Sequence, residues 1–392
     1  MTPQDPRAGP REALLLRAAL LDGDVARSSW RAWRADADLD RIDQGSFRLL
    51  PLVWRNLERL DEDDPWRGRL KGFYRLAWSE NQILFRRVAL VLASLERAGI
   101  PTLVMKGAAL ASQAYRDSGA RPMADADVLV RRRDFVAAVA HLRRSGWTAD
   151  PRRSGDFDAS PEDFRARYHA LGFLAEGDRL PSLDLHDRAL QVYARHPVEF
   201  PEDRLLADAE PFDLAGFVAK RPSPEHALIH VCFHGFQRQD VSPIRWIADA
   251  DRLIRTHGAA LRWDRLIDDA RRARVVSAVR DALGYLAEEF DAPVPTAALR
   301  RLRRTPLSFV DRLERAMRLG EPAILADYGK SLAPALRRAR ERGAARRPRA
   351  ETTVRAAYRL SVRLPKRHLR RALARILHGS PTAPVPAPGA RP

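Results

Sequence analysis

Apolar residues recur with helical spacing over three N-terminal segments, 11–37, 46–60 and 67–98. Intervals of three and four residues place such side chains on one face of a helix, and that face must pack against other apolar surface. The pattern therefore predicts a layer of helices over residues 1–98.

The pattern changes after this layer. Residues 99–107, GIPTLVMKG, combine β-branched and apolar side chains in a short run that indicates a buried strand. A short helix stopped by Gly119 follows, then a second strand at 126–130 and a second helix over 132–146. Strands that alternate with helices in this way are typical of an α/β unit.

Downstream of this unit the pattern predicts a loop, a hairpin and further helices. Residues 150–166 are polar, and we expect a loop there. Strands at 170–176 and 182–186 then flank a turn near Gly177 and Asp178. Helical spacing returns beyond residue 202. The helices expected there cover 203–219, 224–237, 243–257 and 263–290.

Composition narrows the class of protein. The chain of 392 residues contains no run of 18 apolar residues, so we expect no transmembrane helix. Its first residues lack the features of a signal peptide, and the single cysteine, Cys232, fits a reducing compartment. Abundant Arg and Ala with little Lys are typical of a high-GC bacterial genome. We therefore expect a cytoplasmic, bacterial protein.

The net charge of +18 is distributed unevenly. Residues 331–378 carry 15 Lys and Arg against two acidic side chains, whereas residues 1–330 carry 53 basic and 49 acidic side chains. The positive excess thus belongs to the C-terminal tail, which we expect to be partly disordered. Such a tail could contact RNA, an anionic membrane surface or an acidic partner, or could remain a solvated extension.

Two aspartates precede the second strand, in the sequence RPMADADVLV. Asp125 and Asp127 occupy alternate positions, so both side chains point to one face of the strand. Their mutual repulsion would be relieved by a hard divalent cation such as Mg²⁺. Taken alone, however, this pattern is commoner in acidic turns than in metal sites.

Further residues strengthen the case for a site. Asp184 lies mid-strand, and the three aspartates converge if its strand lies beside 126–130. His186 shares the face of Asp184 and could orient a carboxylate, contact substrate or simply be structural. The residues that could bind phosphate are Lys106 and Arg121, by their charge, and Gly107, by allowing close backbone approach at a helix start.

Other polar patterns favour structural roles. His226, His230 and His234 share one helix face, as in some zinc sites, but no Glu accompanies them and their neighbours are apolar. We interpret this segment as a core helix with one histidine, His234, facing the site. Asp249 and Asp251 lie about 200° apart on a helix, which indicates a partly solvated face.

Five segments of the chain together resemble those of a known protein family. Residues 103–135, LVMKGAALASQAYRDSGARPMADADVLVRRRDF, resemble the signature of a bacterial family of uncharacterised nucleotidyltransferases with the DNA polymerase β-like fold. The similarity continues in four further segments. These are LDLHDRAL (183–190), ALIHVCFHGF (227–236), IRWIADADRLI (244–254) and LRWDRLIDDARRARV (261–275).

The resemblance implies an α+β fold. Its nucleotidyltransferase core, a mixed sheet over 99–200, would lie between an N-terminal helical region (1–98) and a C-terminal helical region (201–330), followed by the basic tail (331–392).

The resemblance also implies an activity, the transfer of a nucleoside monophosphate from an NTP such as ATP to an unidentified acceptor. Asp125, Asp127 and Asp184 would be the catalytic ligands of two Mg²⁺ or Mn²⁺ ions, and His186, His234 and Asp249 would line the substrate cleft. Ala108 stands where relatives of the wider fold carry serine or glycine. Two alternatives therefore stay open: a toxin-like transferase acting on tRNA, and a catalytically weak nucleotide sensor or scaffold.

Overall fold

The computed structural model of the protein describes residues 6–175, 177, 182–190, 202–236, 244–307 and 315. All of them belong to one compact unit. The basic tail expected over 331–392 and the turn residue Asp178 lie outside the described residues.

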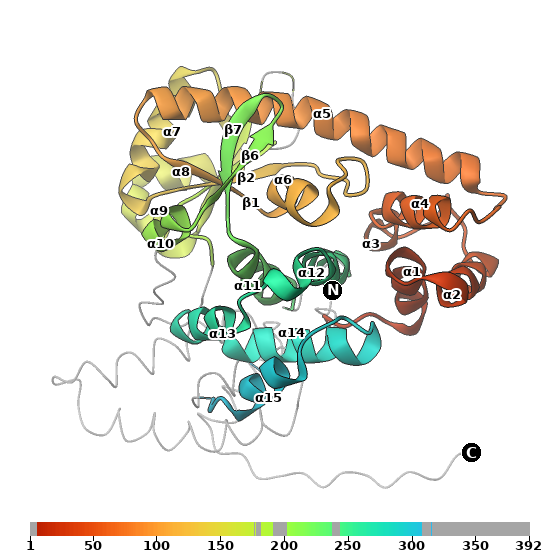
Figure 1. Cartoon of the computed structure of the whole chain (residues 1–392). Coiled ribbons are helices and arrows are strands. Elements are labelled where there is room, and N and C mark those ends of the chain that lie inside the picture. The colour runs from red at the N-terminus through yellow and green to blue at the C-terminus, as the bar shows by residue number, and fades with distance from the viewer. Residues whose placement is uncertain are drawn as a thin grey trace, which may run out of the picture. The chain divides into compact units, whose positions relative to one another are not determined.

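The N-terminal helical layer is confirmed. Apolar stripes bury one side of each long helix, and α1 and α4 both contribute leucines that are fully buried. The layer consists of α1 (Pro10–Leu20), α2 (Gly23–Ala35), α3 (Gln44–Phe47), α4 (Leu50–Arg59) and α5 (Arg67–Arg97). In Figure 1, α5 runs from this layer along the central sheet.

A mixed five-stranded sheet forms the centre, in the order β1-β2-β5-β4-β3. Its only parallel pair is β2 with β5, and the other pairs are antiparallel. The strands are β1 (Thr102–Met105), β2 (Ala126–Val130), β3 (Thr148–Ala149), β4 (Ala170–Leu174) and β5 (Leu183–His186). The α+β class and the hairpin of β4 and β5 are therefore confirmed, whereas β3 is too short to be visible in the sequence pattern.

The two faces of the sheet are covered differently. Val104, Val128 and Leu185 point into a large core together with α5 and α7 (Phe135–Arg144). On the other face, Leu103, Met105 and Leu129 pack with Leu205 of α10 (Glu202–Ala207). Because side chains alternate along a strand, the side chains of Asp127 and Asp184 project from this second face.

The expected loop over 150–166 is wrong. The segment forms α8 (Pro151–Ala159) and α9 (Pro161–Arg167). The side chain of Asp150 accepts a hydrogen bond from the backbone N–H of Arg152, that of Ser160 accepts one from the backbone N–H of Asp163, and each helix has proline at its first position. These capping signals outweigh the polar composition of the segment.

The single helix expected over 203–219 is also wrong. After α10 the chain forms a hairpin of β6 (Glu210–Leu214) and β7 (Phe217–Arg221). Its turn residues Ala215 and Gly216 have φ of 52° and 87°, a left-handed conformation that matches a two-residue hairpin turn. This backbone geometry excludes a continuous helix.

Helix α6 (Lys106–Leu110) packs against β1 and β2, and the π-helical turn η1 (Ala111–Tyr115) follows it. Helix α11 (Pro224–Gly235) contacts α6 and α12 (Arg245–His257), and α12 packs on η1. The helix expected over 263–290 is interrupted at Arg274, whose φ is 52°. The C-terminal helices are α13 (Trp263–Arg272), α14 (Val276–Glu289) and α15 (Thr296–Arg304). Across the described segments, every helix is too short or too polar to cross a bilayer.

Candidate functional site

The acidic residues meet at the ends of two neighbouring strands. Asp127 in β2 and Asp184 in β5 are register partners in the parallel pair, so their side chains lie next to each other on one face. Asp125 comes directly before β2, two positions from Asp127. The adjacency on which convergence of the three aspartates depends is therefore present.

One group of side chains has the geometry of a metal site. Ligand atoms of Asp127, Asp184 and His186 all lie within 4.8 Å of one another, and no other such group occurs in the described part of the chain. His186, only 1% exposed, contacts Oδ1 of Asp127 through Nε2 at 2.8 Å. The structure thus brings His186 into the group, whereas Asp125 stands at its edge.

The pKa values of these three carboxylates are shifted in different directions. Burial, followed by repulsion from Asp127, raises the pKa of both Asp125 and Asp184. Burial also disfavours the charged form of Asp127, but the Lys106 ammonium and the His186 hydrogen bond hold its pKa well below its usual range. The cluster is therefore a concentration of negative charge, which a divalent cation would relieve.

Lys106 lies at this cluster. It follows the last residue of β1, and its ammonium donates to Oδ1 of Asp127. Burial lowers the pKa of Lys106, but the three aspartates together raise it by more than burial lowers it. The side chain therefore stays charged. Its φ of 47° is left-handed, an uncommon conformation for a residue with a Cβ.

Arg121 is held in a buried ion pair. Its Nε and Nη2 donate to the two carboxylate oxygens of Asp249, each at 2.8 Å, and the Tyr115 hydroxyl donates to the same carboxylate at 2.7 Å. A Cβ on Gly107 would lie 2.7 Å from Nη1 of Arg121 and from Sδ of Met123. Gly107 thus makes room for Arg121 against the first turn of α6.

The expectation of a partly solvated face around Asp249 and Asp251 is wrong. Both side chains are buried, and each accepts hydrogen bonds from an arginine, Arg121 in the first case and Arg255 in the second. The structure therefore brings Asp249 to Arg121 and not to the aspartate cluster.

Arg245 is a candidate that sequence reasoning missed. It begins α12, one helical turn before Asp249, and its Nη1 donates to the backbone oxygen of Pro122 at 2.9 Å. Within the described residues no carboxylate pairs with it. Burial and then the neighbouring charge of Arg121 lower its pKa to about 10, while its own charge lowers the pKa of Asp125. Its only signal in the sequence is its place near the start of the segment IRWIADADRLI (244–254).

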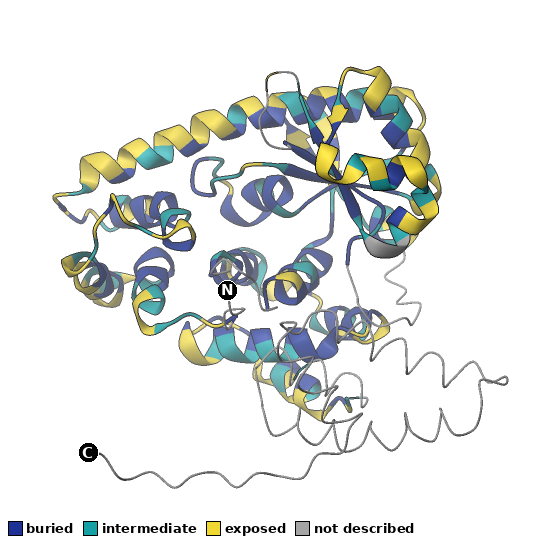
Figure 2. Ribbon diagram, turned by 180° about the vertical axis from the view of Figure 1, so that it is seen from behind, coloured by how far each residue is buried: buried dark blue, intermediate teal, exposed yellow. Residues whose placement is uncertain are grey.

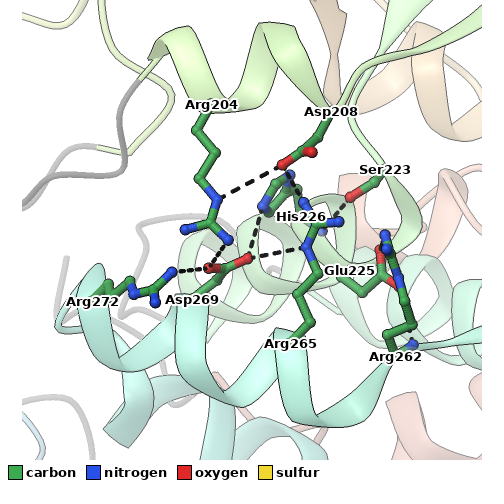
Figure 3. Close-up of polar contacts among 9 residues, drawn as sticks. All are labelled: Arg204, Asp208, Ser223, Glu225, His226, Arg262, Arg265, Asp269 and Arg272. Carbon is green, nitrogen blue, oxygen red and sulfur yellow. Dashed lines mark hydrogen bonds and ion pairs between the residues drawn. The ribbon is translucent and has the colours of Figure 1, made fainter.

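The histidine helix is a core helix, as expected. Most residues of α11 are buried, and its histidines belong to no metal group among the described residues. Figure 3 shows His226 directed at Asp269, with Nε2 3.1 Å from the carboxylate. His234 is exposed, and its ring centroid lies 5.7 Å from that of His230. His230 lines a mainly apolar pocket together with Lys106 and Leu205.

The comparison with known protein families gives the class of the protein. Residues 46–291 match the model of a protein family described as "Uncharacterised nucleotidyltransferase". The chain belongs to this family. It is therefore a transferase of the nucleotidyltransferase class, and the matched region contains β1, β2, β5, the aspartate cluster and Arg245.

A solved structure with detectable similarity is an antigenic nucleotidyltransferase-like protein from Paracoccidioides brasiliensis. It shares 16% sequence identity with this chain, and the alignment covers 55% of this chain and 92% of that one with a TM-score of 0.35. No curated protein matches the chain.

Proposed function

We propose that the protein transfers a nucleoside monophosphate from an NTP to an unidentified acceptor on a small molecule, peptide or protein. The observation that carries this proposal is the convergence of Asp127, Asp184 and His186 at the ends of β2 and β5, with Asp125 beside them. Family membership independently supports nucleotidyl transfer.

The donor set fits a divalent cation. Mg²⁺ and Mn²⁺ prefer carboxylate oxygens. Burial and then repulsion from Asp127 raise the pKa of Asp184, and such an ion would relieve that repulsion. Asp127 and Asp184 would hold the metal, Asp125 would join them from the chain before β2, and His186 would orient Asp127. When bound, the ions would stabilise phosphate charge and activate the acceptor hydroxyl.

We assign the phosphate contacts to cations beside the cluster. Lys106 and Arg245 both carry positive charge near Asp125, and Arg245 has no carboxylate partner in the described regions. Arg121 lies next to Gly107, but its charge is balanced by Asp249. In this proposal Arg121 positions the loop before β2, and Gly107 makes room for it.

The test is transfer of label from α-³²P NTPs to cell extract or candidate acceptors in the presence of Mg²⁺. We expect Asp127→Asn and Asp184→Asn to lower transfer by more than about 100-fold, beyond the usual cost of losing a group that only supports a ligand. Asp63→Asn, at an exposed position, is the matched control and should leave transfer unchanged. Full activity of folded Asp127→Asn would contradict the proposal, and NTP binding without transfer by the unmodified protein would favour the sensor.

A further inference from the structure

Helix α5 carries an apolar stripe on its outer face. Leu76, Ile83 and Leu90 are 53%, 54% and 73% exposed and stand seven residues apart. Ser79 and Arg86 lie between them and are also exposed. Positions that alternate in steps of three and four lie on one face of a helix. Figure 2 shows exposed residues along the whole outer side of α5.

The opposite side of α5 is fully used by the fold. Leu84, Val88 and Leu95 are buried in the large core that also contains Val104, Val128 and Leu185 of the sheet. The stripe is therefore no extension of this core. A seam of large apolar residues at seven-residue spacing is the surface against which a second helix packs.

We propose that this stripe, residues 76–90, is the interface with a second copy of the chain, in which the two α5 helices pair antiparallel about Ile83. In a two-fold symmetric pair of this kind, residues at equal distances before and after the centre lie at the same level. Leu76 of one copy then meets Leu90 of the other, because each stands seven positions from Ile83. The stripe is self-complementary in this register.

Charge complementarity selects the same register. Glu80 and Arg86 stand three positions before and after Ile83, both are exposed, and neither forms an ion pair with the described part of its own chain. Antiparallel pairing brings Glu80 of each copy level with Arg86 of the other, twice by symmetry. Parallel pairing would instead place like charges together, which is unfavourable.

The expected dimer is reversible. The 15 residues of the stripe span about 22 Å, and a helix pair of this length buries an area at or below the low end of specific interfaces, roughly 1,200 Å². We therefore expect a dissociation constant on the order of micromolar. The interface lies on the face of α5 away from the sheet, and it does not depend on the proposed function.

Sedimentation velocity on the full chain tests the proposal, over roughly a hundredfold concentration range around the expected constant. The unmodified protein should shift from monomer to dimer, and Ile83→Asp should stay monomeric with an unchanged circular-dichroism spectrum. Val136→Asp on α7, where the original side chain is 43% exposed, is the matched control and should dimerise normally.

Charge reversal tests the register. Glu80→Arg and Arg86→Glu should each weaken dimerisation by about tenfold or more, since like charges then face each other, and the double variant should restore it. A monomer at every concentration would overturn the proposal, whether the stripe is then open to solvent or covered by another segment of the same chain. A dimer that Ile83→Asp leaves intact would overturn it as well.

Discussion

At the scale of single residues, two arginines near the aspartate cluster differ in what holds their charge. Arg121 is 5% exposed and donates two hydrogen bonds to Asp249. Arg245 donates to a backbone oxygen only, and burial beside Arg121 lowers its pKa to about 10. Arg245 is therefore the cation whose charge an incoming phosphate would balance, whereas Arg121 already has its counter-ion.

This contrast predicts opposite effects of two substitutions. Arg245→Met should weaken binding of ATP by about tenfold or more, because a charge-assisted contact is lost, with little loss of stability. Arg121→Met should lower the free energy of unfolding by about 3–5 kcal/mol, because Asp249 is left buried and unpaired. Titration calorimetry with ATP and Mg²⁺, and urea unfolding, measure the two effects.

Arg300→Met, on the exposed side of α15, is the control for loss of a single positive charge and should change neither quantity. Unaltered ATP affinity in Arg245→Met would remove this residue from the phosphate site. An equal loss of stability in both variants would show that Arg245 is structural.

Some residues of the site could be predicted from the sequence, and the contacts of others could not. Asp125, Asp127 and Lys106 lie at a strand start and a strand end, and such positions can be recognised from hydrophobic pattern alone. The contact of His186 with Asp127 depends on which strands are neighbours, and the partner of Arg121 comes from 128 positions further along the chain. Contacts of this kind leave no mark in local spacing.

At the scale of elements, a polar cluster connects three helices of the C-terminal region. Asp269 of α13 lies 3.1 Å from Arg204 of α10 and accepts a contact from His226 of α11 at 3.1 Å (Figure 3). Arg265 and Arg272 stand 3.5 Å from the same carboxylate. One buried acid thus balances several cations and holds α10, which closes the second face of the sheet.

Replacing this acid should loosen all three helices. We expect Asp269→Ala to lower the free energy of unfolding by about 3–5 kcal/mol, because the arginines lose a buried counter-ion. Asp268→Asn on the same helix, where the carboxylate is 46% exposed, should cost less than about 1 kcal/mol. Urea unfolding of both variants tests this, and equal losses would mean that Asp269 has no special role.

Elements with a strong period were predictable, and those set by backbone turns were not. The apolar run of β2 and the long period of α5 are visible in the sequence. The hairpin of β6 and β7 depends on left-handed φ at Ala215, a residue type that gives no turn signal. At 150–166, polar composition concealed two short helices that side-chain caps and prolines begin.

At the scale of the whole molecule, several buried or half-buried histidines have a lowered pKa, and two of them, His169 and His230, lie near Lys106. Burial and then the neighbouring His186 and Lys106 lower the pKa of His169 to about 2, and burial, His234 and Lys106 lower that of His230 well below its ordinary value. Burial is also the main cause that lowers the pKa of His226 and the pKa of His257. The folded chain therefore resists protonation at positions contributed by several elements.

This resistance makes stability depend on pH. In the unfolded chain a histidine has a pKa of about 6.5, so the unfolded state binds protons that the folded state excludes, and stability falls as the pH drops below that value. His169 alone should cost about 1.4 kcal/mol at pH 5.5 relative to neutral pH. Urea unfolding at pH 7.5, 6.5 and 5.5 measures the slope, and His169→Gln should reduce it. Asp125 and Asp184, whose raised pKa values act in the opposite sense, are present in both proteins, so the difference between the two slopes isolates His169. Identical slopes would mean that folding does not lower the pKa of His169.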